Sequence, residues 1–305
     1  MGAQLTILDV DTGVDDALAI AYALRSPELK LLGLTTCYGN VTVDEAARNT
    51  LIVMDQLGVE GIPVFKGASK PFTRVKQHPR HIHGEHGLGE AQVYEPKEQA
   101  SDRHAVDFII EQVHRHPHEM TLIFVGPLTN LALALQQDPA IAGLIGRVVI
   151  MGGAVRVPGN VTKIAEANIY SDPEAADIVF KADLPLTVVG LDVTLKTLLP
   201  LAVVKQWREC DPKVGGFFAD MTEFYIRFYE SAYPGIGGCG MHDPLAVGVA
   251  IDPSLVTEVP MHIEIETTDE TLGKTREIPD GNPNCKVCVS VDSERFLKHF
   301  LSRVV

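Results

Sequence analysis

The feature of this sequence that most constrains its fold is an abrupt change near the N-terminus, from an apolar run to a cluster of carboxylates. Residues 5–8 form an apolar run of the kind that becomes a buried strand. Four aspartates then fall within eight residues, namely Asp9, Asp11, Asp15 and Asp16. Gly13 interrupts them and an apolar-periodic segment begins, which predicts a strand that turns directly into a helix.

Four carboxylates at one turn repel one another, and this repulsion destabilises the fold unless positive charge lies among them. The amides at a helix N-terminus supply only a partial positive charge. A hard divalent cation such as Ca²⁺ or Mg²⁺ binds carboxylate oxygens and needs no Cys or His ligand. The cluster therefore predicts a metal site. The alternative is a solvated acidic turn in which one aspartate is a helix N-cap.

Strand and helix patterns alternate along the chain. Strands are predicted at residues 5–8, 29–36, 63–65, 121–125, 147–151 and 186–191. Helices are predicted at residues 14–25, 44–57, 105–114, 128–136 and 173–181. This alternation is typical of an α/β fold with a mostly parallel central sheet flanked by helices. Residues 259–266 and 285–291, joined through 267–283, predict a small antiparallel C-terminal addition. No repeat or linker divides the chain, so we expect a single domain, 1–305.

Two long stretches break this pattern and are predicted to be functional loops. Residues 67–99 are polar and rich in histidine, and residues 215–240 carry aromatic side chains followed by a glycine-rich run. The four histidines of the first stretch lack the regular spacing and the partner set of a zinc site. We therefore interpret both stretches as loops that bind a ligand.

Composition excludes several classes of partner. The 305 residues carry a formal net charge of −14, which argues against nucleic acid or an anionic membrane surface as the main partner. No signal peptide or apolar run long enough to span a bilayer is apparent, and five cysteines are an odd number, so a reduced, cytoplasmic location is expected. Cys285 and Cys288 have metal-like spacing, but no second pair accompanies them and they would point to opposite faces of a strand.

The unusual polar residues follow the predicted strands, where ligands of open α/β sheets bind. They are Asp9 and Asp11, the Gly39-Asn40 pair, the 125–130 segment, Met151-Gly-Gly with Asn160, Glu166 and Asn168 after it, and, further on, His242-Asp243 at a predicted helix start. Each signal is weak alone. Their collection along one edge of the sheet predicts a binding site there.

Taken in order, these motifs resemble the inosine-uridine preferring nucleoside hydrolase family across nearly the whole chain. The matching segments are Asp9-Val-Asp11-Thr-Gly-Val-Asp15-Asp16, Gly39-Asn40, His83-Gly84, Gly126-Pro-Leu-Thr-Asn130, Met151-Gly-Gly, Asn160, Glu166-Ala-Asn168 and His242-Asp243. The resemblance implies a Rossmann-like sheet and a Ca²⁺-dependent enzyme that cleaves a ribonucleoside to ribose and a free base.

The resemblance also implies roles for individual residues. Asp11, Asp16 and Asp243, with the backbone carbonyl of Val125, would hold the calcium. The residues implied to contact substrate are Asp15, Asn40, His83, Met151, Asn160, Glu166, Asn168, Tyr225, Tyr229 and Asp243. Thr12 replaces the family's usual proline, and Ala167 replaces a common phenylalanine, which opens space near the sugar's 5′ side.

The chemistry needs an activated water, a stabilised oxocarbenium-like sugar and an assisted leaving base. Asp11 is expected to take a proton from a metal-held water, and His242 to act as general acid, because its ordinary pKa lies near neutrality. The alternative for His242 is a helix-capping or packed histidine. His83, Tyr225 and Tyr229 are expected to line the base pocket, although the tyrosines also have the spacing of core residues on a helix.

Two other functions remain as alternatives. A haloacid dehalogenase-type, Mg²⁺-dependent phosphatase would use Asp9 as its nucleophile, and a non-catalytic nucleoside-binding protein would need neither a base nor an acid. The resemblance implies a homotetramer or homodimer. It ranks inosine and uridine as the first substrates to test.

Overall fold

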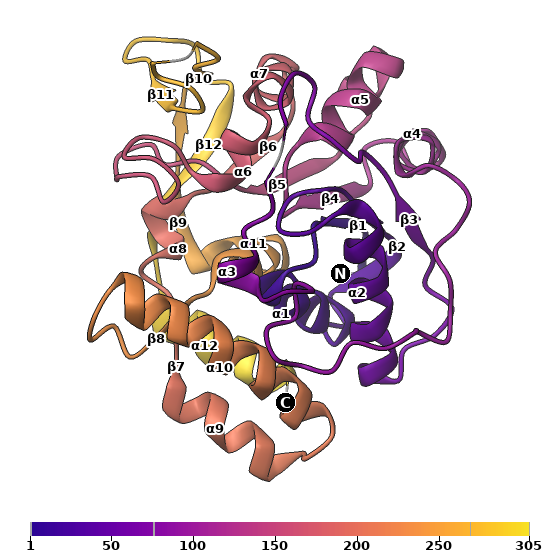
Figure 1. The fold of residues 1–305 in the computed structure, drawn as a ribbon. Coiled ribbons are helices and arrows are strands. Elements are labelled where there is room, and N and C mark those ends of the chain that lie inside the picture. The colour runs from indigo at the N-terminus through magenta and orange to yellow at the C-terminus, as the bar shows by residue number, and fades with distance from the viewer. Residues whose placement is uncertain (1, 76, 269, 305) are drawn as a thin grey trace.

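A central sheet of eight strands runs through the molecule (Figure 1). The computed structural model describes residues 2–75, 77–268 and 270–304. In spatial order the strands are β3 (Val64–Lys66), β2 (Leu29–Thr36), β1 (Gln4–Val10), β4 (Met120–Phe124), β5 (Arg147–Met151), β6 (Leu186–Val189), β12 (Cys285–Val291) and β9 (Val256–Met261). Every neighbouring pair is parallel except β12 and β9, so most strands end at one common edge.

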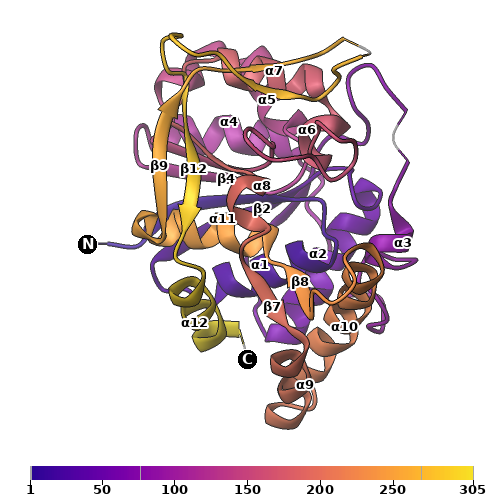
Figure 2. The ribbon, with the colours of Figure 1, turned by 90° about the vertical axis from the view of Figure 1, so that its left-hand side faces the viewer.

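Helices cover both faces of this sheet, as Figures 1 and 2 show. One face packs under α4 (Ala105–Arg115), α5 (Thr129–Gln137) and α7 (Pro173–Lys181). The other packs under α1 (Val14–Leu24), α2 (Val43–Leu57), α10 (Val214–Ala232), α11 (His242–Ile251) and α12 (Ser293–Val304). Along β5, Val148 and Ile150 enter one core while Val149 and Met151 enter the other, as expected for a strand buried on both faces.

Shorter elements connect these layers. They are α3 (Arg80–His83), α6 (Ala167–Ser171), α8 (Leu191–Thr194), α9 (Leu201–Cys210) and the 3₁₀ turns η1 (Pro139–Gly143) and η2 (Pro253–Leu255). Two small antiparallel sheets pair β7 (Leu198–Pro200) with β8 (Gly238–Gly240), and β10 (Ile263–Ile265) with β11 (Thr275–Glu277). None of the helices in the described ranges is long and apolar enough to cross a membrane.

Local chemistry explains where a helix such as α2 begins and ends. The Thr42 hydroxyl accepts a hydrogen bond from the Glu45 amide, and the Glu45 carboxylate accepts one from the Thr42 amide. This reciprocal cap satisfies amides that have no partner within the helix. The helix ends at Gly58, whose φ of 66° lies in the left-handed region that glycine adopts at low cost.

The predicted mostly parallel α/β architecture with a small antiparallel C-terminal addition is confirmed. Residues 285–291 form β12, which pairs antiparallel with β9 and also joins the main sheet parallel to β6. Residues 259–266 span the end of β9 and all of β10, which belong to different sheets. Cys285 and Cys288 contribute to the two opposite cores, as their spacing predicted.

The prediction of a long loop at residues 215–240 is wrong. Most of it is the 19-residue helix α10, and only the glycine-rich end is irregular before β8. Gly215 and Gly216 lie in the first turn of the helix, where the cost of glycine is small. Tyr225 and Tyr229 then share one helix face. Residues 67–75 and 77–99 are mainly irregular, as predicted, apart from the single turn α3.

Candidate active site

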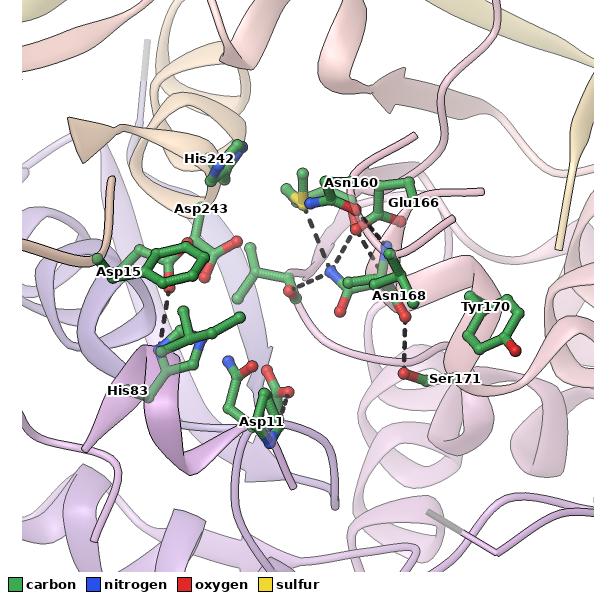
Figure 3. A pocket seen from close by; sticks show the side chains of 18 of the residues that line it. Asp11, Asp15, His83, Asn160, Glu166, Asn168, Tyr170, Ser171, His242 and Asp243 are labelled. Atoms are coloured by element: carbon green, nitrogen blue, oxygen red, sulfur yellow. Dashed lines mark hydrogen bonds and ion pairs between the residues drawn. The ribbon is translucent and has the colours of Figure 1, made fainter. Parts of the chain in front are cut away.

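A cavity of about 850 Å³ opens where β1, β4 and β5 end (Figure 3). Nearly all of the residues predicted from the sequence line it: Asp11, Asp15, Asn40, His83, Val125, Met151, Asn160, Glu166, Asn168, Tyr225, Tyr229, His242 and Asp243. Asp16 is the one predicted site residue that does not line the cavity, although it contacts residues that do. The fold therefore brings together side chains from widely separated parts of the chain.

Asp16 organises the turn between β1 and α1. Its two carboxylate oxygens accept hydrogen bonds from the Asp11 amide at 3.0 Å, the Gly13 amide at 2.9 Å and the Asn40 side chain at 3.0 Å. A helix begins here because this carboxylate satisfies amides at its N-terminus. The strand-to-helix turn predicted from the sequence is confirmed, and Asp16 is what closes it.

Asp11 is held by the segment that follows β2. Its Oδ2 accepts a hydrogen bond from the Asn40 amide at 2.6 Å. A Cβ atom at Gly39 would lie 1.9 Å from the same oxygen, so only glycine allows this approach. The Gly39-Asn40 pair therefore fixes the position of the Asp11 carboxylate at the cavity wall.

Three buried carboxylates, Asp15, Asp16 and Asp243, each place an oxygen within 4.8 Å of the others. Burial raises the pKa of Asp15 to about 8, and the charge of Asp16 adds to this rise. Burial, followed by the charges of Asp15 and Asp16, raises the pKa of Asp243 well above its ordinary value. The negative charges are therefore costly without a cation, and their all-oxygen donor set fits a hard divalent ion.

This cluster differs in one member from the ligand set implied by the resemblance. Asp15 lies in the 4.8 Å group, whereas Asp11 lines the same cavity outside it. The Val125 carbonyl accepts a hydrogen bond from the Asn168 side chain at 2.8 Å, and the Met151 carbonyl accepts one from the same amide group at 3.1 Å. Asn168 thus ties together the ends of β4 and β5 beside the carboxylates.

Glu166 and Asn160 shape the opposite side of the cavity, seen to the right in Figure 3. Glu166 caps α6: its oxygens accept hydrogen bonds from the amides of Gly153, Asn168 and Ile169. The Asn160 side-chain oxygen accepts one from the Ala167 amide at 3.0 Å. These contacts hold the loop after β5 over the cavity, so both residues have a positioning role.

Aromatic side chains from α3 and α10 form the wall facing the carboxylates. The His83 and Tyr225 rings stack with centroids 5.3 Å apart, and Tyr225 packs edge-on against Tyr229 at 5.0 Å. The Val14 amide donates a hydrogen bond to Nδ1 of His83 at 3.2 Å, which ties α3 to the start of α1. The two tyrosines are buried on a helix, as their spacing predicted, and they also line the cavity.

His242 differs from its predicted character. Burial lowers its pKa to about 4, so the imidazole is neutral near pH 7 and is not the ordinary near-neutral acid that the sequence suggested. Its Nε2 lies 2.5 Å from the Tyr229 hydroxyl, and its Nδ1 lies 2.7 Å from the Thr194 hydroxyl. Each imidazole nitrogen of His242 therefore has a hydroxyl partner, and the partner that lines the cavity is Tyr229.

Asp9 has a structural environment that does not suit a nucleophile. It is fully buried and does not line the cavity. Its Oδ2 accepts hydrogen bonds from the Thr35 hydroxyl at 2.5 Å and the Asn130 side chain at 2.8 Å, and burial raises its pKa to about 7. The phosphatase alternative requires an accessible Asp9, which this arrangement does not provide.

Several residues of the site were not identified from the sequence. Thr194, which contacts His242, lies in the short helix α8, and a lone threonine gives no signal. His81 of α3 and Phe228 of α10 are edge-on neighbours in the aromatic wall, 6.1 Å apart. Recognising residues 215–232 as a helix would have placed Phe228 with Tyr225, one turn away. The residue types alone do not show that these side chains share one face of the cavity.

Comparison with known proteins identifies relatives that match almost the whole chain. The family model for inosine-uridine preferring nucleoside hydrolase matches residues 6–298. An inosine-uridine preferring nucleoside hydrolase of Leishmania major is 39% identical, with 95% of this chain and 94% of that protein covered. Uridine nucleosidase 1 of Arabidopsis thaliana is 38% identical, with 88% and 80% covered. A solved purine-preferring ribonucleoside hydrolase from Gardnerella vaginalis is 45% identical, with 99% and 98% covered and a TM-score of 0.95.

Proposed function

This chain belongs to the inosine-uridine preferring nucleoside hydrolase family, and we propose that it cleaves ribonucleosides to ribose and free base with the help of bound calcium. The observation that carries this proposal is that two adjoining groups of residues line one cavity and meet where His83 lies 4.0 Å from Asp15. The carboxylate end comprises Asp11, Asp15, Asp16, Asp243 and Asn40. The aromatic end comprises His81, His83, Tyr225, Phe228, Tyr229 and His242.

A ribonucleoside has matching ends. Its ribose presents neighbouring hydroxyls, which need oxygen and amide partners, and its base presents a flat π-face with polar edges. The sugar therefore binds at the carboxylate end with Asn168 and Glu166 beside it, and the base lies against the aromatic end. This orientation places the glycosidic bond between the two groups of residues.

The metal would be held by the buried carboxylates. Asp16 and Asp243 were predicted as ligands, Asp15 lies within reach of both, and Asp11 and the Val125 carbonyl line the adjacent wall. When bound, a divalent ion supplies positive charge that holds the sugar diol and polarises the attacking water. Several carboxylates with a carbonyl favour Ca²⁺, which accepts 6–8 oxygen ligands in flexible geometry, over the smaller Mg²⁺.

Asp11 is the proposed general base. Its carboxylate is fixed by the Asn40 amide at the cavity wall, so it can take a proton from a water placed beside the sugar. As the C–N bond breaks, positive charge develops on the ribose. The surrounding carboxylates and carbonyls, already oriented before the reaction, stabilise this charge.

At the aromatic end, Tyr229 is the proposed donor to the leaving base, and His242 orients it. The Tyr229 hydroxyl contacts His242, and both residues line the cavity. A hydrogen bond from this hydroxyl to a base nitrogen stabilises the electron pair that the base carries away. The general-acid role expected for His242 is thus replaced by one in which the neutral imidazole holds the tyrosine.

The experiment that tests this function incubates the protein with ribonucleosides and measures release of free base. Inosine, uridine, cytidine and adenosine are compared, because the relatives are named for different bases. Each reaction is repeated after chelation and after adding back Ca²⁺ or Mg²⁺. Base release restored by Ca²⁺ supports the proposal. Tight nucleoside binding without base release would favour a binding protein, and hydrolysis of phosphate esters alone would favour a phosphatase.

Two further expectations from the sequence stay predictions. An assembly of two or four copies is proposed, and light scattering of the purified protein measures it directly. A cytoplasmic location is also proposed, and fractionation of the source cells with a specific antibody would test it.

A further inference from the structure

Thr194 contacts His242 but is not among the residues that line the cavity. It is the last residue of α8 and is fully buried. Its hydroxyl lies 2.7 Å from Nδ1 of His242. Among the residues that the structure describes, this hydroxyl has no other hydrogen-bond partner. The Thr194 hydroxyl therefore hydrogen-bonds to one imidazole nitrogen of His242.

The count of hydrogens at this contact selects one tautomer of His242. A neutral imidazole has one nitrogen that donates and one that accepts. If Nδ1 carried the hydrogen, the Thr194 hydroxyl would accept it, and the hydroxyl's own hydrogen would be buried without an acceptor. If Thr194 instead donates to Nδ1, every group is satisfied. Because buried donors are almost always paired, the second arrangement is favoured and Nε2 carries the hydrogen.

The tautomer decides what Tyr229 can do. With the hydrogen on Nε2, His242 donates to the Tyr229 oxygen across their 2.5 Å contact. Tyr225 packs edge-on against Tyr229, with ring centroids 5.0 Å apart. Because the Tyr229 oxygen accepts from His242 in this arrangement, its own hydrogen is free to point into the cavity that Tyr229 lines.

We propose that Thr194 is a positioning residue that fixes His242 as the Nε2–H tautomer and thereby turns the Tyr229 hydrogen toward the leaving base. This inference rests on the proposed function, and it adds a residue that no sequence motif marks. No proton passes along the chain from Thr194. The base departs with the electron pair of the glycosidic bond, Tyr229 stabilises it by a hydrogen bond, and the base takes its proton from solvent.

The test compares Thr194→Val, which removes the hydroxyl while keeping the shape, with Thr194→Ser, which keeps the hydroxyl. Thr222→Val is the matched control, because Thr222 is buried and its hydroxyl has no partner among the described residues. Turnover of inosine is compared with turnover of p-nitrophenyl riboside, whose leaving group needs no hydrogen bond. We expect kcat of Thr194→Val with inosine to fall about tenfold. KM and the activity on the nitrophenyl riboside should change little.

Each other outcome is informative. Equal losses on both substrates would make Thr194 merely structural, and an unchanged kcat with inosine would overturn the proposal. Thr194→Ser should keep kcat with inosine close to that of the unmutated protein, and a loss as large as that of Thr194→Val would contradict the proposal. Nitrogen-15 NMR of the histidine rings in the unmutated protein gives a separate readout, which survives if Thr194→Val does not fold: a hydrogen on Nδ1 of His242 contradicts the proposal. Absence of base release by the unmutated protein would instead contradict the proposed function and leave the tautomer result standing.

Discussion

The carboxylate end and the aromatic end of the cavity are built in different ways. The first is formed by residues directly after β1 and β2 and at the start of α11, so the central sheet fixes its geometry. The second is formed by His242, from the start of α11, together with α3 and α10, which lie outside the sheet and meet through ring contacts such as that of His83 with Tyr225. The geometry of the carboxylate end, where the sugar is proposed to bind, therefore follows from the central sheet. The aromatic end, where the base is proposed to bind, can vary while the sheet is kept.

The largest effect is expected when the substrate lacks a ribose hydroxyl that the carboxylate end is proposed to bind. Replacing inosine by 2′-deoxyinosine removes one of the hydroxyls that the buried carboxylates and the metal are proposed to hold. Leaving such polar groups unpaired should lower kcat/KM about 10⁴-fold. Steady-state kinetics on the two nucleosides measure this ratio. A ratio near one would mean that the carboxylate end does not bind the diol.

The next largest effect is expected from Asp11→Asn, which keeps the side-chain shape but removes the base. The kcat should fall about 10³-fold, with a smaller change in KM. Asp44→Asn is the control, because Asp44 lies on the surface in an ion pair with Lys66. Asp16→Ala should also be nearly inactive, through loss of the turn and of a proposed metal ligand. An Asp11→Asn protein that keeps its activity would remove Asp11 from the role of base.

A smaller effect, dependent on the leaving group, is expected at the aromatic end. His242→Ala should lower kcat with inosine about 10²-fold, because the Tyr229 hydroxyl loses its partner. It should have little effect with p-nitrophenyl riboside. This contrast separates the two ends, since a change at Asp11 should slow both substrates. Equal losses in the His242 variant would assign the residue to the sugar end or to folding.

The smallest effect is expected on stability. The pKa of Asp15 is raised to about 8 in the folded chain, above its ordinary value of 3.8. Its stabilising contribution is therefore fully present only below the unfolded pKa, and is lost as pH rises through the folded pKa. In metal-free protein the melting temperature should fall by about 3 °C between roughly pH 6 and 9. Saturating Ca²⁺ should abolish this fall. Calorimetry at constant ionic strength measures the melting temperature at each pH. A fall of the same size in the presence of Ca²⁺ would contradict the prediction.

The same contrast governs what could be predicted from sequence. The carboxylate end could be located because a strand, four aspartates and a helix are consecutive, and the helix begins at Val14 as predicted. Which of its carboxylates lie closest together could not be predicted. The side-chain directions past the end of β1 place Asp15, rather than Asp11, within 4.8 Å of Asp16 and Asp243. That grouping depends on tertiary packing of α11 against α1, which no local pattern encodes.

The aromatic end was harder to predict because its signals conflict. The aromatic side chains and the glycine-rich run of residues 215–240 suggested a loop, while the spacing of Tyr225 and Tyr229 suggested a helix, and the structure has the helix. The antiparallel pairing of β12 with β9 was predicted, but its parallel pairing with β6 was not, because a parallel neighbour comes from a distant part of the chain. The low pKa of His242 results from complete burial, which a sequence neighbour such as Asp243 does not reveal.

The central claim is that the buried carboxylates bind a divalent cation that in turn holds the sugar. A crystal structure with Ca²⁺ and an uncleaved inosine analogue tests it most directly. We predict an ion at about 2.3–2.6 Å from oxygens of Asp16, Asp243 and the two sugar hydroxyls, with the base against Tyr225 and Tyr229. A nucleoside bound with no ion among the aspartates, or with its base at the carboxylate end, would contradict the account.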